Sequence, residues 1–173
     1  MPFGRGKWLG NDWHWLANGL LGNRKVNGIT TSSRSVPLTN TNVQNNSNSF
    51  SAVQRPNISG DASLPGDRTT DEKLARWFNT GVFAQPAPFT FGNAPRVISN
   101  VRLDGIRNID FSLFKSFPIS ESQRMELRGE FFNFFNTPQF AGPNQSFGNP
   151  NFDVVTAQQN IPRQVQLGLK IYF

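Results

Sequence analysis

Residues 162–173 alternate between apolar side chains and polar or small ones. The apolar positions fall on every second residue, and they are Val165, Leu167, Leu169, Ile171 and Phe173. Because side chains alternate between the two faces of a β-strand, this set shares one face of a predicted strand. A transmembrane β-strand needs such a face for lipid and a polar face for a lumen, but the last edge strand of a soluble β-sandwich has the same alternation. This stretch alone leaves both settings open.

Two further alternating stretches precede it and are separated by a short polar turn. In residues 106–118 the apolar face carries Ile109, Phe111, Leu113 and Phe117. In residues 123–137 one face carries the charged side chains Glu126, Arg128 and Glu130. Ionised side chains are costly in a protein core and cheap in a water-filled lumen, so we predict that these three face a lumen. The charged row therefore favours the barrel.

The rest of the chain predicts two more strands, two long loops and one helix. Residues 1–9 have the pattern of the end of a strand, and residues 24–37 are rich in the β-branched side chains typical of strands. Residues 38–105 and 138–161 are rich in Asn, Ser, Gly and Pro, which predicts long loops, and we expect residues 38–68 to bury little apolar area. A helix is predicted at Thr69–Phe78 inside the first loop, with Thr70 as its N-cap.

Short and long connections alternate along these predicted strands. Strands that cross a membrane alternate in this way when short turns lie on the periplasmic side and long loops lie outside. We therefore predict an all-β fold: antiparallel up-and-down strands from the C-terminal end of a transmembrane β-barrel, with long extracellular loops and one short helix. The predicted location is the bacterial outer membrane, and we expect the export signal upstream of Met1.

Composition and charge exclude several other classes of function. The net charge is +6 and the sequence pI is about 10.5, but the basic residues are scattered, so no nucleic-acid partner is expected. The chain has no cysteine and a single histidine, His14, so we predict no metal, no cofactor and no catalytic triad. Glu126 and Glu130 lie four residues apart on a strand, roughly 13 Å, which is too far for a retaining pair of carboxylates. The sequence thus predicts a protein that is not an enzyme.

The last hairpin resembles a known family. The stretch NIDFSLFKSFPISESQRMELRGEFFNFFNTPQF, followed by SFGNPNF and PRQVQLGLKIYF, is similar to the C-terminal end of TonB-dependent receptors of the Oar-like type. The elements PFGRGK, VNGITT, QRPN, PGDRT, WFN and FGNAPR extend the resemblance over essentially the whole chain. It implies a large outer-membrane transporter whose external loops capture an extracellular ligand.

The resemblance also implies partners and missing parts. Val165, Leu167, Leu169, Ile171 and Phe173 would form the signal recognised by the barrel-assembly machinery. TonB would act through a plug domain that this sequence lacks, and the barrel wall would contact outer-membrane lipid. Five predicted strands cannot close a barrel, for which about eight is the minimum, so we expect the C-terminal fragment of such a receptor.

One alternative from a different class is a secreted β-sandwich that serves in adhesion or binds carbohydrate. Its aromatic platform would consist of Trp8, Trp13, Trp15 and Trp77. A monomer that folds in plain buffer would favour the sandwich, whereas dependence on detergent would favour the barrel.

Overall fold

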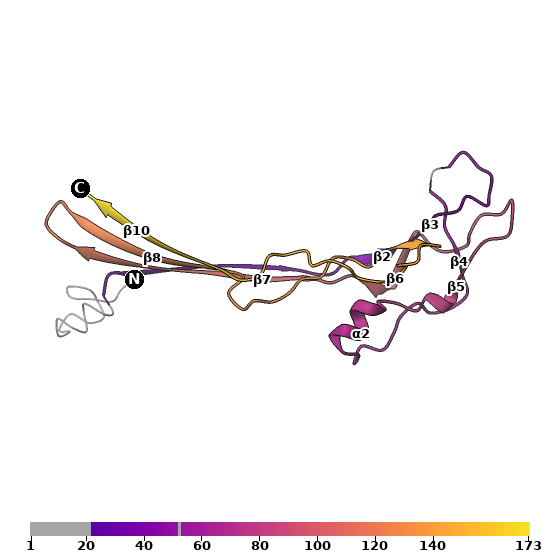
Figure 1. Cartoon of the computed structure of the whole chain (residues 1–173), viewed down its shortest axis with the longest axis horizontal. Coiled ribbons are helices and arrows are strands. Elements are labelled where there is room, and N and C mark those ends of the chain that lie inside the picture. Colours follow the sequence, from indigo (N-terminus) through magenta and orange to yellow (C-terminus); the bar gives the residue numbers. More distant parts are fainter. Residues whose placement is uncertain (1–21, 52) are drawn as a thin grey trace. The chain divides into compact units, whose positions relative to one another are not determined.

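The computed structural model describes residues 22–51 and 53–173, which form two compact units (Figure 1). The first, called the strand unit here, contains the described residues up to Ser32 together with Arg107–Thr137 and Ile161–Phe173. The second, called the loop unit, contains Ser33–Ile106 and Pro138–Asn160. The strand predicted at 1–9 lies outside the described residues, as does His14.

The strand unit is built on a four-stranded sheet with the order β1-β7-β8-β10. Its strands are β1 (Arg24–Ser33), β7 (Ile106–Pro118), β8 (Arg124–Phe132) and β10 (Gln164–Tyr172). Strand β8 pairs antiparallel with β7 on one side and with β10 on the other. These assignments confirm the all-β, antiparallel prediction.

The register of β7, β8 and β10 brings like side chains together on each face. Gly129 of β8 lies between Leu113 and Leu167, and Met125 lies between Phe117 and Ile171. The apolar positions of the three strands therefore share one face, which is the outcome that period-two alternation predicts. This face is open in the described residues: Leu167 is 76% exposed, and Val165, Leu169 and Ile171 are also exposed.

Lys115 is a charged side chain within the apolar row of β7, whose other charged member, Arg107, lies at the start of the strand. Its ammonium donates a hydrogen bond to the carbonyl of Gly22 and lies 5.3 Å from the centre of the Phe117 ring. A lysine stem can cover apolar surface in this way while its charged end finds a polar partner. The interruption therefore leaves the apolar character of the face largely intact.

The strands are shorter than the sequence predicts, so the predicted limits 24–37 and 123–137 were wrong at their C-terminal ends. Strand β1 ends at Ser33, and β8 ends at Phe132. Asn133 follows β8 with a φ of 50° and its side chain accepts the backbone N–H of Thr137 at 2.9 Å. Asparagine adopts this left-handed conformation more readily than most residues, and it turns the chain out of the sheet.

The prediction that residues 38–68 bury little apolar area was wrong, because Leu38 and Ala62 are completely buried. The loop unit has a hydrophobic core drawn from distant parts of the chain: Leu38, Ala62, Phe78, Phe83, Ile98, Val101 and Phe152. The ring of Phe78 meets Phe83 and Phe152 edge-to-face, with centroid distances of 5.7 and 5.1 Å. Edge-to-face packing is a favoured arrangement of aromatic rings. A few well-placed aromatic side chains therefore organise a segment whose average composition is polar.

Short elements surround this core. Strand pairs form between β2 (Pro37–Thr39) and β6 (Val97–Arg102), between β3 (Thr41–Asn42) and β9 (Ser146–Phe147), and between β4 (Asn57–Ile58) and β5 (Phe83–Ala84). The only helices among the described residues are α2 (Thr70–Ala75) and the 3-10 helix η1 (Thr80–Val82). No helix in this described part is long and apolar enough to cross a membrane.

Helix α2 confirms the predicted helix, but it is shorter and its cap is different. Thr69 rather than Thr70 is the N-cap, and its side chain accepts the backbone N–H of Glu72. The Glu72 carboxylate accepts the backbone N–H of Thr69 in return, at 2.8 Å. This reciprocal capping box satisfies two donors that the first turn leaves free. Threonine occupies both positions 69 and 70, so the pattern alone did not distinguish them.

Gly92 is a position where the loop unit has no room for a side chain. A Cβ atom added there would lie 1.9 Å from the carbonyl oxygen of Arg55 and 2.5 Å from that of Pro56. Gly92→Ala should therefore destabilise the loop unit by about 3 kcal/mol, because backbone atoms must move to relieve the overlap. Amide hydrogen exchange of residues 54–58 in the folded full chain measures this. Gly66→Ala is the control, since nothing lies within 4 Å of its added Cβ, and equal protection in the two variants would contradict the prediction.

Candidate functional site

The charged row of β8 lies on the face of the sheet opposite the apolar one. Glu126 pairs with Ser116 and Lys170, Arg128 with Phe114 and Gly168, and Glu130 with Ser112 and Gln166. The Nε of Arg128 donates to the Oε1 of Glu126 at 2.6 Å. All three side chains are partly exposed. The structure thus places the predicted residues together on one polar face, where the sheet can accommodate their charge.

Aromatic side chains on the same face contact the cations. The guanidinium of Arg124 lies 4.2 Å from the centre of the Tyr172 ring, and the ammonium of Lys170 lies 4.6 Å from the same ring. Arg128 lies 5.4 Å from the centre of the Phe114 ring. Such contacts stabilise a cation by roughly 0.5–1 kcal/mol at an exposed site. Alternation along the sequence did not predict these contacts, because Phe114 is an aromatic residue among the polar positions of β7 and its cation partner lies on a different strand.

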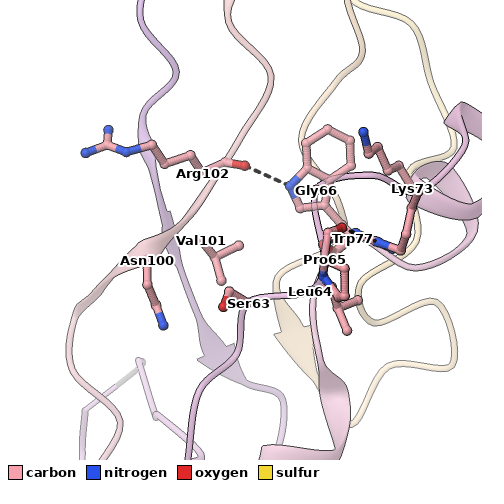
Figure 2. A pocket seen from close by; sticks show the side chains of 10 residues that line it. Ser63, Leu64, Pro65, Gly66, Lys73, Trp77, Asn100, Val101 and Arg102 are labelled. Atoms are coloured by element: carbon pink, nitrogen blue, oxygen red, sulfur yellow. Dashed lines mark hydrogen bonds between the residues drawn. The ribbon is translucent and has the colours of Figure 1, made fainter.

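The loop unit contains a separate cleft beside Trp77, with a volume of about 190 Å³ (Figure 2). One wall comes from Trp77, which follows α2, and from the preceding turn at Pro65; the other comes from Val101 of β6. The indole Nε1 of Trp77 donates to the carbonyl of Arg102 at 2.9 Å. Figure 2 shows the guanidinium of Arg102 extending away from Trp77. The lining of the cleft thus combines an aromatic wall with the basic residues Arg68, Lys73 and Arg102, and it includes no acidic residue.

Arg68 holds the floor of this cleft in place. Its guanidinium donates to the backbone carbonyls of Pro65 at 3.0 Å and Glu72 at 3.3 Å, and to those of Arg76 and Trp77. Arg76 and Trp77 follow the last residue of α2, where carbonyls lack partners within a helix, and Arg68 supplies a donor to each. Four of its five N–H donors are thus used by the backbone, so the main contribution of Arg68 is to the structure of the cleft. Sequence reasoning missed this role because the bonded residues follow no simple spacing.

Comparison with known protein families shows to which family the chain belongs. The family model described as an outer membrane beta barrel domain matches residues 1–166. The chain belongs to this family. No curated protein matched the chain. No solved structure matched it.

The barrel domain therefore resides in the bacterial outer membrane, where its strands contribute to the wall of a barrel. This assignment favours the barrel over the β-sandwich alternative. Of the four tryptophans proposed for carbohydrate binding in that alternative, only Trp77 lies in the described residues, and its Nε1 bonds to the protein's own backbone. The roles of Glu126, Arg128 and Glu130 in a lumen remain predictions.

The barrel domain offers no obvious metal centre in its described residues. No group of three or more His, Cys, Asp or Glu side chains lies close enough to hold an ion there. The buried carboxylate of Asp153 stands apart from other acids and faces arginines instead. Its Oδ2 lies 3.9 Å from the Nε of Arg76. The backbone carbonyl of Asp153 also accepts the backbone N–H of Trp77 at 3.1 Å. This bond links the segment Pro138–Asn160 to the residues that follow α2.

Burial raises the pKa of Asp153 from its ordinary value of 3.8 to about 6, while Arg76 and Arg68 partly oppose this rise. A carboxyl whose pKa is higher in the folded state binds its proton more tightly there. The contribution of Asp153 to stability is therefore fully present below pH 3.8 and is lost as the pH rises through about 6. We expect the loop unit of the barrel domain to become more stable as the pH falls across this window.

Asp153→Asn tests this pH dependence. Asparagine keeps the shape and tolerates the φ of 77° at this position, but it does not titrate. We expect the variant to lose the pH dependence between 3.8 and about 6. Hydrogen exchange of the Trp77 and Val155 amides, corrected for intrinsic rates, is the measurement. An unchanged pH profile in the variant would show that another group is responsible.

Proposed function

We propose that this barrel domain is the C-terminal part of a TonB-dependent transporter of the Oar-like type. In this proposal β1, β7, β8 and β10 form part of the barrel wall, and the loop unit belongs to the external surface that captures a ligand. The observation that carries the proposal is the sheet register, which puts an open apolar face opposite the row Glu126, Arg128 and Glu130. The resemblance of the last hairpin to Oar-like receptors supplies the link to TonB.

The parts of the proposed transporter have distinct roles. The apolar face of the sheet contacts outer-membrane lipid, and the charged row tunes the interior through which a ligand passes. Val165, Leu167, Leu169, Ile171 and Phe173 serve as the signal for the barrel-assembly machinery. TonB acts on a plug domain encoded upstream of these residues and supplies the energy for uptake.

Binding to TonB tests the proposal directly. The complete gene product, with its upstream residues, should co-purify with the periplasmic domain of TonB. The matched control is the complete product from which only the plug domain is deleted, with the export signal and every barrel strand retained, and we expect it to lose TonB and keep its place in the outer membrane. Failure of the complete product to bind TonB would refute a TonB-dependent role and leave the barrel assignment unaffected.

A further inference from the structure

Three exposed phenylalanines lie on two loops of the loop unit, and we call Phe50, Phe89 and Phe91 the aromatic tip. Phe89 is 78% exposed and Phe91 is 72% exposed, and the Phe50 side chain is fully exposed. Single exposed apolar residues are common, but several large aromatic side chains on joined loops mark an interaction surface. The core of the unit is already filled by other phenylalanines, so packing does not explain these three.

Backbone contacts join the two loops that carry the aromatic tip. The N–H of Phe89 donates to the carbonyl of Asn46 at 2.6 Å, and the Nδ2 of Asn46 donates to the carbonyl of Pro86 at 3.0 Å. Two further hydrogen bonds join the same segments. The N–H of Asn93 donates to the Oδ1 of Asn57 at 3.0 Å, and the N–H of Ile58 donates to the Oδ1 of Asn93 at 2.7 Å. Hydrogen bonds therefore hold together the two loops that carry the aromatic tip.

The conformation of Phe89 is unfavourable for its side chain. The N–H of Thr90 donates to the carbonyl of Ala87 at 3.1 Å, which closes a turn with Pro88 and Phe89 at its two central positions. Phe89 has a φ of 64°, as the third residue of a type II turn requires, and glycine is the residue preferred there. A non-glycine residue in this region costs roughly 1–2 kcal/mol. Strain that folding does not explain is characteristic of functional surfaces.

The charge around the aromatic tip restricts the ligand that it fits. Residues 38–60 and 79–103, which contain both loops, have no Asp or Glu. Arg55, Arg96 and Arg102 are exposed in these segments, and Arg102 already donates to the carbonyl of Ser35 at 3.1 Å. The other polar side chains are mainly the amides and hydroxyls of Asn, Gln, Ser and Thr, which donate and accept hydrogen bonds without charge. A ligand for this surface therefore carries hydroxyl groups, apolar ring faces and negative charge.

We propose that the aromatic tip binds an acidic oligosaccharide, a chain of sugar rings bearing carboxylates. The C–H faces of the sugar rings stack on the negative faces of the Phe rings, and Arg55 and Arg96 pair with the carboxylates. The inference rests on the proposed ligand-capturing role of the loop unit and names its substrate class.

Binding of an oligogalacturonate to the complete gene product, purified in detergent, tests this inference without TonB. Isothermal titration should show weaker binding of the neutral galacto-oligosaccharide of the same length, and affinity for the acidic probe should fall as salt is raised. Phe89→Gly is the decisive variant, because it removes the ring and relieves the strained φ together. We expect it to weaken binding roughly tenfold, the effect of about 1.4 kcal/mol, with no loss of stability.

Control variants separate the sources of binding. Phe135→Ala removes an exposed phenylalanine of the strand unit and should leave affinity unchanged, whereas Arg55→Gln should reduce both the affinity and its dependence on salt. Equal binding of the acidic and neutral probes, or unchanged affinity in Phe89→Gly, would overturn the proposal. So would binding of the aromatic tip to vesicles of anionic phospholipid in place of the saccharide. Because no TonB is present, these outcomes are independent of whether the proposed transport role holds.

Discussion

Phe78→Ala should lower the free energy of unfolding of the loop unit by about 3–5 kcal/mol. Phe78 is completely buried and its ring is held by Phe83 and Phe152, so its removal leaves a cavity among side chains that come from separate segments. Hydrogen exchange of residues 77–84 in the folded full chain measures the loss. Phe91→Ala makes the same chemical change at an exposed ring and should alter stability by less than about 0.5 kcal/mol. Similar losses in both variants would mean that Phe78 does not organise this core.

Leu167→Arg should destabilise the barrel by about 2–4 kcal/mol in lipid vesicles, if this position lies near the middle of the bilayer. Leu167 is central in β10 and lies on the open apolar face opposite Gly129. An arginine there places its charge in hydrocarbon unless it reaches the interface. Reversible unfolding in urea from vesicles of defined composition gives the measurement.

Gln166→Arg is the matched control for that prediction, since it makes a new arginine one residue away on the opposite face. There it lies beside Glu130, so we expect little change or a small gain in stability. A greater loss from Gln166→Arg than from Leu167→Arg would show that the lipid and lumen faces are assigned the wrong way round.

The sequence predicted the strand unit more closely than the loop unit. The faces of β7, β8 and β10 follow from alternation between neighbouring residues, and the observed register confirms them. The ends of the strands were less predictable, because Asn133 leaves β8 through its own backbone conformation and a side-chain hydrogen bond. Helix α2 was predicted in position because capping and side-chain spacing are also local features.

The loop unit shows where local patterns stop being informative. Phe78, Phe83 and Phe152 follow no common period in the sequence. Along the chain, strands β7 and β8 lie between Phe83 and Phe152. Arg68 donates to four carbonyls only because the fold brings them together, and the burial of Asp153 depends on tertiary structure in the same way. Neither residue stands out by its neighbours in the sequence.

The sequence by itself determined the two-sided character of the strands and the order in which short turns and long insertions connect them. Each strand carries this information in adjacent residues, since steric alternation of side chains needs no distant partner. Only the tertiary structure decided that the long insertions have a core, that Asp153 is buried beside arginines and that Phe89 is exposed in a strained turn. These features arise when segments far apart in the chain come together, because burial is a property of the assembled contacts.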